Sequence, residues 1–311
     1  MTLVIFGALN IIAVLLLSPL FMTIIKKAKA YAQRRKGPPL LQGYYTFLKL
    51  LRKEVVYSRN SSWIMRVTPY INMAAMLVAT LFVPIAFIPE PTGYGNIILF
   101  LYMLALPKFF MALSGLDAGS TFGGMGSSRE MTISSVIEPI MVLVFAALVF
   151  SLKTLDITEM FSVAAGSGIL EINTALLPLS IAMFIMLITE TARIPVDNPE
   201  THLELTMVHE AMILEQSGRN LALMELSHAV KQTLLMAFLI NIFMPWGIAT
   251  ALDAAGVAIS IASFALKGAL LAAVIGIFES SMAKSRLFRL PAVFALAFFL
   301  SLLTMLLTVF K

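Results

Sequence analysis

Long apolar stretches recur along the whole chain and alternate with shorter polar segments. A helix needs about 20 predominantly apolar residues to cross a bilayer. Eight stretches approach this requirement, near residues 2–25, 69–89, 97–116, 131–152, 174–190, 232–250, 255–278 and 290–310. The segments between them fall below the roughly 50 residues of a small independent domain. The pattern therefore predicts an all-α integral membrane protein with about eight transmembrane helices and a single transmembrane domain over residues 1–311.

Composition agrees with this pattern. Hydrophobic residues make up 59% of the chain and charged residues 13%, which is typical of an integral membrane protein and excludes a soluble domain. We expect the first stretch to be a retained span, because it is too long for a signal-peptide core and has no basic start. The absence of cysteine excludes disulfides, thiolate zinc sites and cysteine-ligated iron–sulfur clusters. Electrons of any redox reaction must therefore pass through a partner.

Basic residues are unevenly distributed among the polar segments. Segment 26–68 carries eleven lysine and arginine residues against one acid, Glu54, so the positive-inside rule predicts that it is cytoplasmic. With eight spans, segments 117–130, 191–231 and 279–289 are then cytoplasmic too, and both termini are external. Topology and attraction to anionic lipids are a simpler explanation of the basic segment. No nucleic-acid-binding module accompanies it, which argues against nucleic acid as a partner.

The first cytoplasmic segment contains a turn followed by an amphipathic stretch. Gly37-Pro38-Pro39 ends the preceding helix and turns the chain back toward the membrane. Over residues 44–54, aromatic and aliphatic side chains share one helical face, and lysine and arginine share the other. This pattern predicts a cytoplasmic amphipathic helix that lies on the membrane or under a partner.

The second cytoplasmic segment, residues 115–130, is rich in glycine and serine. No Walker lysine follows and no strand precedes it, which argues against a nucleotide-binding loop. We expect close backbone packing against a partner, or a flexible hinge. Glu138 then lies inside the next span beside Pro139, and an intramembrane carboxylate is a functional candidate. The alternative is a structural ion pair, in which Glu138 is the first-choice partner of Lys108 or Lys267.

The third cytoplasmic segment concentrates acidic and imidazole side chains. Seven of the seventeen carboxylates lie between Glu190 and Glu225, and the histidines are His202, His209 and His228. Carboxylates that are close together in apolar surroundings raise one another's pKa values. Such a cluster can take up and release protons near neutral pH. The alternative is a solvated polar loop.

A helix is predicted within this segment. Asp197-Asn198 can cap it, Pro199 can occupy its first position, and it would run to about Gln216 and end at Ser217-Gly218. His209-Glu210 begins like the zinc motif HExxH, but the second histidine is missing, so we exclude a metalloprotease. The histidine spacings are also weak evidence for a metal site.

Several motifs occur together in one order along the chain. They are QRRKGP at 33–38, Lys49-Leu50, Lys53-Glu54, ETARIPVD at 190–197, Glu200, Glu204-Leu205 and EQSG at 215–218. This set resembles the NADH dehydrogenase subunit 1 family, whose members form the eight-helix membrane heel of respiratory complex I. The resemblance spans nearly the whole chain, and the Glu-x-x-Arg-x-Pro-x-Asp motif is specific.

Departures from the complex I pattern indicate a branch of the family. Val196, His202 and Gln216 stand where complex I usually has phenylalanine, glutamate and tyrosine, and about three residues around 208–210 are additional. These differences fall where the family shapes its quinone chamber. The runs GSSRE at 126–130, Glu138-Pro139 and AKSR at 283–286 are more similar to the corresponding subunit of membrane-bound NiFe hydrogenases and formate hydrogenlyases.

The resemblance implies a membrane-anchor and energy-coupling subunit of an energy-converting, membrane-bound hydrogenase complex in the cell (cytoplasmic) membrane. Hydrogenase large and small (iron–sulfur) subunits would dock on its cytoplasmic side, and antiporter-like membrane subunits would share the membrane arm. The NiFe centre and iron–sulfur clusters would lie in these partners, with no cofactor and no catalytic residue in this chain. Electron transfer would be linked to translocation of protons or sodium ions.

Two sets of residues are candidates, one for proton or ion coupling and one for docking the redox module. The set for proton or ion coupling contains Lys108, Glu138, Glu190, Asp197, Glu200, Glu204, His209, Glu210, Glu215, Lys267 and Glu279. The set for docking the redox module contains Arg34, Arg35, Lys36, Gly37, Pro38, Arg193 and Pro195.

Two other functions stay open at this point. One is the quinone-chamber subunit of a complex I-type NADH or F420H2 dehydrogenase. The other is a stand-alone secondary ion transporter, although such transporters usually show two similar halves with broken helices, and this sequence shows no internal repeat.

Overall fold

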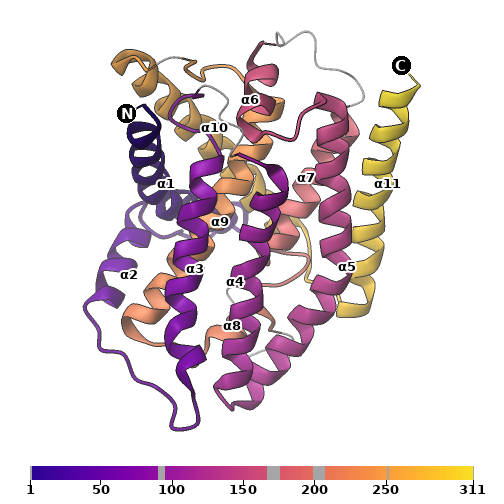
Figure 1. Cartoon of the computed structure of the whole chain (residues 1–311). Coiled ribbons are helices and arrows are strands. Elements are labelled where there is room, and N and C mark those ends of the chain that lie inside the picture. The colour runs from indigo at the N-terminus through magenta and orange to yellow at the C-terminus, as the bar shows by residue number, and fades with distance from the viewer. Residues whose placement is uncertain (1, 90–94, 167–175, 199–206, 251, 311) are drawn as a thin grey trace.

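The computed structural model describes residues 2–89, 95–166, 176–198, 207–250 and 252–310, which are mostly helical (Figure 1). The helices are α1 (Thr2–Ala32), α2 (Gln42–Leu51), α3 (Trp63–Phe82), α4 (Ile97–Asp117), α5 (Thr121–Leu152), α6 (Ile157–Gly166), α7 (Leu176–Glu190), α8 (His209–Ile213), α9 (Gly218–Phe243), α10 (Ala254–Ser281) and α11 (Leu290–Val309). Seven are long and apolar enough to cross a membrane, and α7 is a shorter apolar helix. The all-α, multi-pass prediction of about eight spans is confirmed.

The long helices form one bundle with α9 near its centre (Figure 1). α9 contacts α1, α2, α3, α6, α7 and α10, and 78% of its apolar stretch is buried, against 22% for α11. Around it, α3 packs on α4, α1 packs on α10, and α11 packs on α5 and α7. The start of α1 and the end of α11 lie at the same end of the bundle (Figure 1). We call this the terminal end, and the end that carries α8 the opposite end.

The predicted amphipathic helix is present as α2, which has no buried residue. It lies against α1, because a Cβ atom at Gly43 would come within 2.8 Å of the carbonyl oxygen of Pro19. Tyr45 and Leu48 remain exposed. α2 therefore keeps an apolar surface available to lipid or to a partner.

The glycine- and serine-rich segment is helical, which corrects the predicted loop or hinge. Ser120 caps α5 by accepting a hydrogen bond from the Gly123 amide at 3.1 Å. The backbones of Gly115 and Gly123 are in such close contact that no Cβ atom fits, and a Cβ at Gly126 would lie 2.9 Å from Ala211. The glycines therefore allow α5 to pack on α4 and α8 of the same chain.

The segment 207–231 also differs from its prediction. Ser217-Gly218 begins α9 and does not end a helix. Gly218 adopts a positive φ of 52°, and a Cβ atom there would collide with the carbonyl oxygen of Glu54, so only glycine fits. Of the predicted helix from Asp197 to Gln216, the described part contains only the short α8. Residues 199–206, with Pro199, Glu200, His202 and Glu204, lie outside the described residues.

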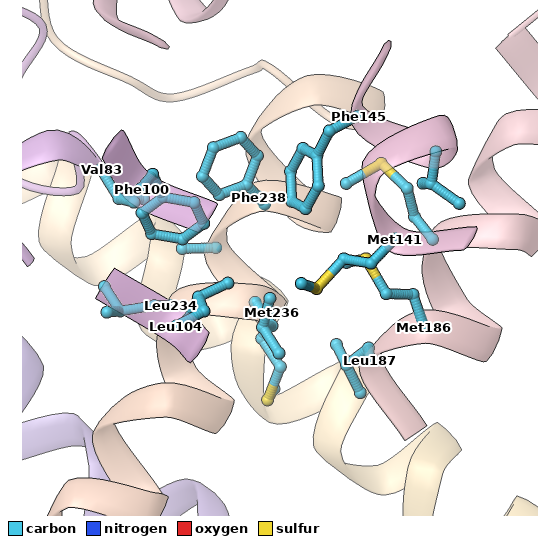
Figure 2. Close-up of a cluster of buried hydrophobic side chains, with 14 of the residues drawn as sticks. Val83, Phe100, Leu104, Met141, Phe145, Met186, Leu187, Leu234, Met236 and Phe238 are labelled. Atoms are coloured by element: carbon cyan, nitrogen blue, oxygen red, sulfur yellow. The ribbon is translucent and has the colours of Figure 1, made fainter. Parts of the chain in front are cut away.

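The terminal half of the bundle has an apolar core (Figure 2). Phe238 of α9 lies with its ring centroid 4.9 Å from that of Phe100 and 5.5 Å from that of Phe145. Figure 2 shows these three rings in a row, with Leu104 and Met236 on one side of them. Edge-to-face and tilted ring contacts of this kind add about 0.5–1.5 kcal/mol per pair to the burial itself.

A buried extended segment, residues 83–88, follows α3, so the predicted span 69–89 is helical only to Phe82. Asn10 satisfies its backbone: Nδ2 donates to the carbonyls of Thr80 and Val83 at 2.6 and 2.7 Å. Its Oδ1 accepts from the amides of Ile85 and Ala86 at 3.0 and 3.3 Å. Non-helical backbone at membrane depth needs such partners, since lipid offers none.

Candidate functional site

Three charged side chains from three helices meet in the interior of the bundle. Glu190, at the end of α7, accepts from Lys108 Nζ of α4 at 2.8 Å through Oε1. Its Oε2 accepts from Lys231 Nζ of α9 at 2.6 Å. All three residues are at most 8% exposed. We call Lys108, Glu190 and Lys231 the ionic cluster; buried charges persist only when they are paired in this way.

The ionic cluster revises the predicted lysine pairing. Glu138 lies 3.9 Å from Lys108 with 44% of its side chain exposed, so it is the more distant of the two carboxylates that pair with Lys108. Lys267 does not pair with Glu138. Its Nζ donates to the carbonyls of Met244 and Trp246 at 3.0 and 2.8 Å and lies 4.9 Å from the Trp246 ring.

A second group of buried polar side chains lies between α1, α9 and α10. Arg193 donates to Glu279 at 3.1 Å and to Gln232 at 2.6 Å. Lys29 lies 3.5 Å from the other oxygen of Glu279. Glu279 is therefore neutralised by two cations, which is a structural role beside the coupling role predicted for it.

Asp197 joins the segment after α7 to two other parts of the chain. Its Oδ2 accepts from the amides of Val208 and His209 at 3.1 and 3.0 Å, so it caps α8 from eleven residues upstream. Its Oδ1 accepts from Lys284 Nζ at 2.6 Å. The prediction that Asp197 caps a helix identified the right function but placed that helix directly after it.

Two cavities border these groups. The inner cavity, of about 40 Å³, is lined by the ionic cluster together with Glu130, Asn72, Thr189 and Ser227, among others. This volume is enough for two or three water molecules, since one needs roughly 10–15 Å³. The outer cavity, of about 350 Å³, lies between α1, α2, α8 and α9 and is lined by apolar residues such as Met22 and Phe47 and by Lys26, Arg193, Glu210 and Glu225.

His209 and His228 lie between the two cavities. Their ring centroids are 4.3 Å apart, and both residues line both cavities. Burial lowers the pKa of His209 to about 4, so its ring is neutral at physiological pH. Burial, and then the neighbouring Glu225, raise the pKa of Glu210 to about 7. The outer cavity thus contains a carboxyl group that exchanges its proton near neutral pH.

The predicted docking residues divide into two groups. Arg34, Arg35 and Lys36 are exposed, and Gly37 and Pro38 are partly exposed. Arg193 and Pro195 are buried, so their prediction as docking contacts is corrected: Arg193 bonds to Glu279 and Gln232 inside the chain, and the carbonyl of Pro195 accepts from the Ser285 amide at 2.9 Å.

The structure also places the remaining candidates and adds others. Glu215 lies half-buried between α8 and α9 and is not among the residues lining either cavity. Glu200 and Glu204 lie outside the described residues. The sequence reasoning missed Glu130, Lys231 and His228, because it placed Glu130 and Lys231 in loops and gave His228 no role. The apolar residues among 218–231 were the available signal that α9 begins there.

The described residues contain no group of three or more histidine, cysteine, aspartate or glutamate side chains arranged to hold a metal ion. The donor set at the ionic cluster is one carboxylate with two ammonium groups. Ammonium groups repel a cation, so this site suits ion pairing better than a resident metal.

A family model and two proteins of known complexes match nearly the whole chain. The NADH dehydrogenase family model matches residues 6–310. Hydrogenase-4 component C of Escherichia coli (strain K12) is 33% identical over 302 residues, which cover 97% of this chain and 94% of that protein. Formate hydrogenlyase subunit 4 of the same organism is 31% identical over 310 residues, which cover 96% of this chain and 99% of that protein.

A more distant relative and a solved structure extend the comparison. NADH-ubiquinone oxidoreductase chain 1 of Yarrowia lipolytica is 32% identical over 201 residues, 61% of this chain and 58% of that protein. A chain in the structure of the membrane-bound sulfane sulfur reductase, an archaeal respiratory membrane complex, has the same fold, with a TM-score of 0.83 over 99% of this chain at 20% identity. The family predicted from the motifs is confirmed: this chain is a membrane-spanning member of the NADH dehydrogenase (complex I subunit 1/H) family.

Proposed function

We propose that this chain is the membrane-anchor and energy-coupling subunit of an energy-converting, membrane-bound hydrogenase complex. The observation that carries the proposal is the ionic cluster. Three charged groups buried between α4, α7 and α9 border a polar cavity. An ionisable group inside the membrane is energetically costly, so its presence there points to a function. The relatives that align along almost their full length are components of hydrogenase-4 and formate hydrogenlyase.

The proposed partners follow from those relatives. A soluble module with hydrogenase large and small subunits would hold the NiFe centre and the iron–sulfur clusters, and antiporter-like subunits would contact the bundle within the membrane. The exposed residues Arg34, Arg35 and Lys36 suit a docking surface for that module, because guanidinium groups form bidentate contacts with carboxylates. Residues 1–311 would act as one transmembrane domain.

The proposed orientation follows the positive-inside rule. The opposite end, with those parts of segments 26–68, 117–130, 191–231 and 279–289 that lie outside the spanning helices, would face the cytoplasm, and both termini would lie outside the cell membrane. Because the chain has no cysteine, single substitutions test this directly. Lys153→Cys, exposed after α5, should react with an impermeant thiol reagent on intact cells, and Ser128→Cys should not. The reverse labelling would contradict the orientation.

The experiment that tests the function compares carboxyl groups at the two ends of the bundle. Glu190→Gln keeps the shape of the side chain and removes its charge, and Glu159→Gln, on α6, is the matched control. We expect the purified complex to contain nickel, iron and dye-linked hydrogenase activity. In sealed vesicles, Glu190→Gln should reduce ion transport at least tenfold per unit of that activity, and Glu159→Gln should not. Normal transport with Glu190→Gln, or copurification of NADH-oxidising subunits without nickel, would overturn the proposal.

A second candidate is the quinone-chamber role, which the outer cavity supports. Its volume of about 350 Å³ and its mixture of apolar walls with a few polar groups fall within the usual range for small-molecule sites. Quinone analogues should then inhibit electron transfer, and Phe47→Ala should weaken that inhibition. If the complex is insensitive to such analogues, the quinone-chamber role is rejected and only the hydrogenase role remains.

A further inference from the structure

The inner and outer cavities share two residues. Among the residues that the structure describes as lining them, only His209 of α8 and His228 of α9 belong to both. Every other lining residue faces one cavity alone. The two imidazole side chains therefore form a wall that the two cavities share.

The geometry brings the two rings into direct contact. Their centroids are 4.3 Å apart and their planes make an angle of 46°. The backbone of Thr191 also interacts with the His228 ring. A neutral imidazole has one N–H donor and one acceptor nitrogen, so each ring can accept one proton and donate another.

Ionisable side chains line the cavities on both sides of this wall. On the outer side are Glu210 of α8, Glu225 of α9 and Lys26 of α1. On the inner side are Lys108 of α4, Glu130 of α5, Glu190 of α7 and Lys231 of α9. Arg193 and Asp197, from the segment after α7, also act electrostatically on His209.

We propose that His209 and His228 form a two-imidazole relay that transfers protons between the outer cavity and the inner cavity. The inference rests on the proposed coupling role and deepens it. A proton from the outer cavity binds one nitrogen of His209, and the proton on the other nitrogen passes to the free nitrogen of His228. His228 then releases that proton into the inner cavity. Each ring ends as neutral as it began, and transfer in the opposite direction uses the same steps reversed.

Imidazole suits this position better than the alternatives. A neutral ring can accept a proton at one nitrogen and donate one from the other, and it then returns to the uncharged state. Burial keeps His209 uncharged at physiological pH. Asp197 favours a transient imidazolium at His209, whereas Lys231 and Arg193 disfavour it, so the charged state is short-lived. Two aliphatic side chains would pack equally well but would close the path.

The test uses the assembled complex in sealed vesicles, with transport expressed per unit of dye-linked hydrogenase activity. His228→Ala should reduce transport at least tenfold, and added imidazole should restore it, because imidazole fits the vacated space and exchanges protons. Pyrazole has the same size but is a far weaker base, so it should not restore transport. The matched control is Leu235→Ala, which removes a similar volume from α9 at a buried position that lines neither cavity; it should leave transport unchanged with or without imidazole.

The outcomes separate the relay from the coupling role. If Glu190→Gln reduces transport and His228→Ala and His209→Gln do not, the coupling role stands and the relay is overturned. If pyrazole restores transport as well as imidazole does, the rings act by packing, and the relay is again overturned. If Glu190→Gln also leaves transport intact, the proposed function itself fails. Selective rescue by imidazole supports the relay, and a solvent isotope effect that disappears in His228→Ala would strengthen it.

Discussion

The two ends of the bundle satisfy buried polar groups in different ways. At the terminal end, Asn10 binds only backbone groups, and all four of its hydrogen bonds hold residues 80–86 against α1. At the opposite end, Glu190 binds only the charged groups of Lys108 and Lys231, beside a cavity large enough for water. The first arrangement replaces hydrogen bonds that lipid cannot provide. The second pairs ionised side chains with one another in the interior of the bundle, where unpaired charges would be costly.

The apolar and ionic parts of the core reflect the same division. Phe100, Phe145 and Phe238 fill the terminal half (Figure 2), and no charge is needed for their packing. The ionic cluster would be replaceable by aliphatic residues if stability were its only role, since such replacements in soluble proteins are often neutral or stabilising. If the proposed coupling role is right, removing charge from the opposite half should impair transport, whereas changes in the terminal half should affect stability alone.

The largest expected effect is the loss of the carboxylate from the ionic cluster. Glu190→Leu leaves Lys108 and Lys231 without their closest partner, and breaking a buried ion pair costs about 3–5 kcal/mol. We expect a clearly lower unfolding temperature of the purified protein in detergent. The double variant Glu190→Leu/Lys231→Met leaves one buried lysine without its closest partner instead of two, so it should regain part of the stability but not the coupled transport. Recovery of both properties in the double variant would remove the distinction between the two ends.

An intermediate effect is expected at the terminal end. Asn10→Leu leaves the Thr80 and Val83 carbonyls and the Ile85 and Ala86 amides without this partner. Unsatisfied buried groups cost about 1–3 kcal/mol, so the unfolding temperature in detergent should fall by less than in Glu190→Leu. Transport per unit of hydrogenase activity should stay normal in the complexes that assemble. A selective loss of transport would show that the terminal end also takes part in coupling.

The sequence predicts the number and type of helices well, because apolar length alone specifies a span. It misplaces the starts of α5 and α9, since their glycine, serine and charged residues are buried by neighbours that are distant in sequence, as at Gly126 and Ala211. Glu190 is recognisable from its motif and position. Its partners Lys108 and Lys231 are not, because residues 82 and 41 positions away meet only through helix packing.

The smallest expected effect concerns Glu210, whose raised pKa makes the outer cavity sensitive to pH. Burial and Glu225 raise this pKa from 4.5 to about 7, so between these values the folded protein holds a proton that the unfolded chain has released. The stabilisation is fully present below about pH 4.5 and is lost as the pH rises through 7. Compared with Glu210→Gln, the native protein should therefore lose about 1–3 kcal/mol of unfolding free energy between pH 5 and 8, measured as the difference in unfolding temperature in detergent. If the native protein and Glu210→Gln respond identically to pH, Glu210 does not titrate near neutrality. Only the histidine pair and the ionic cluster would then distinguish the opposite end from the terminal end.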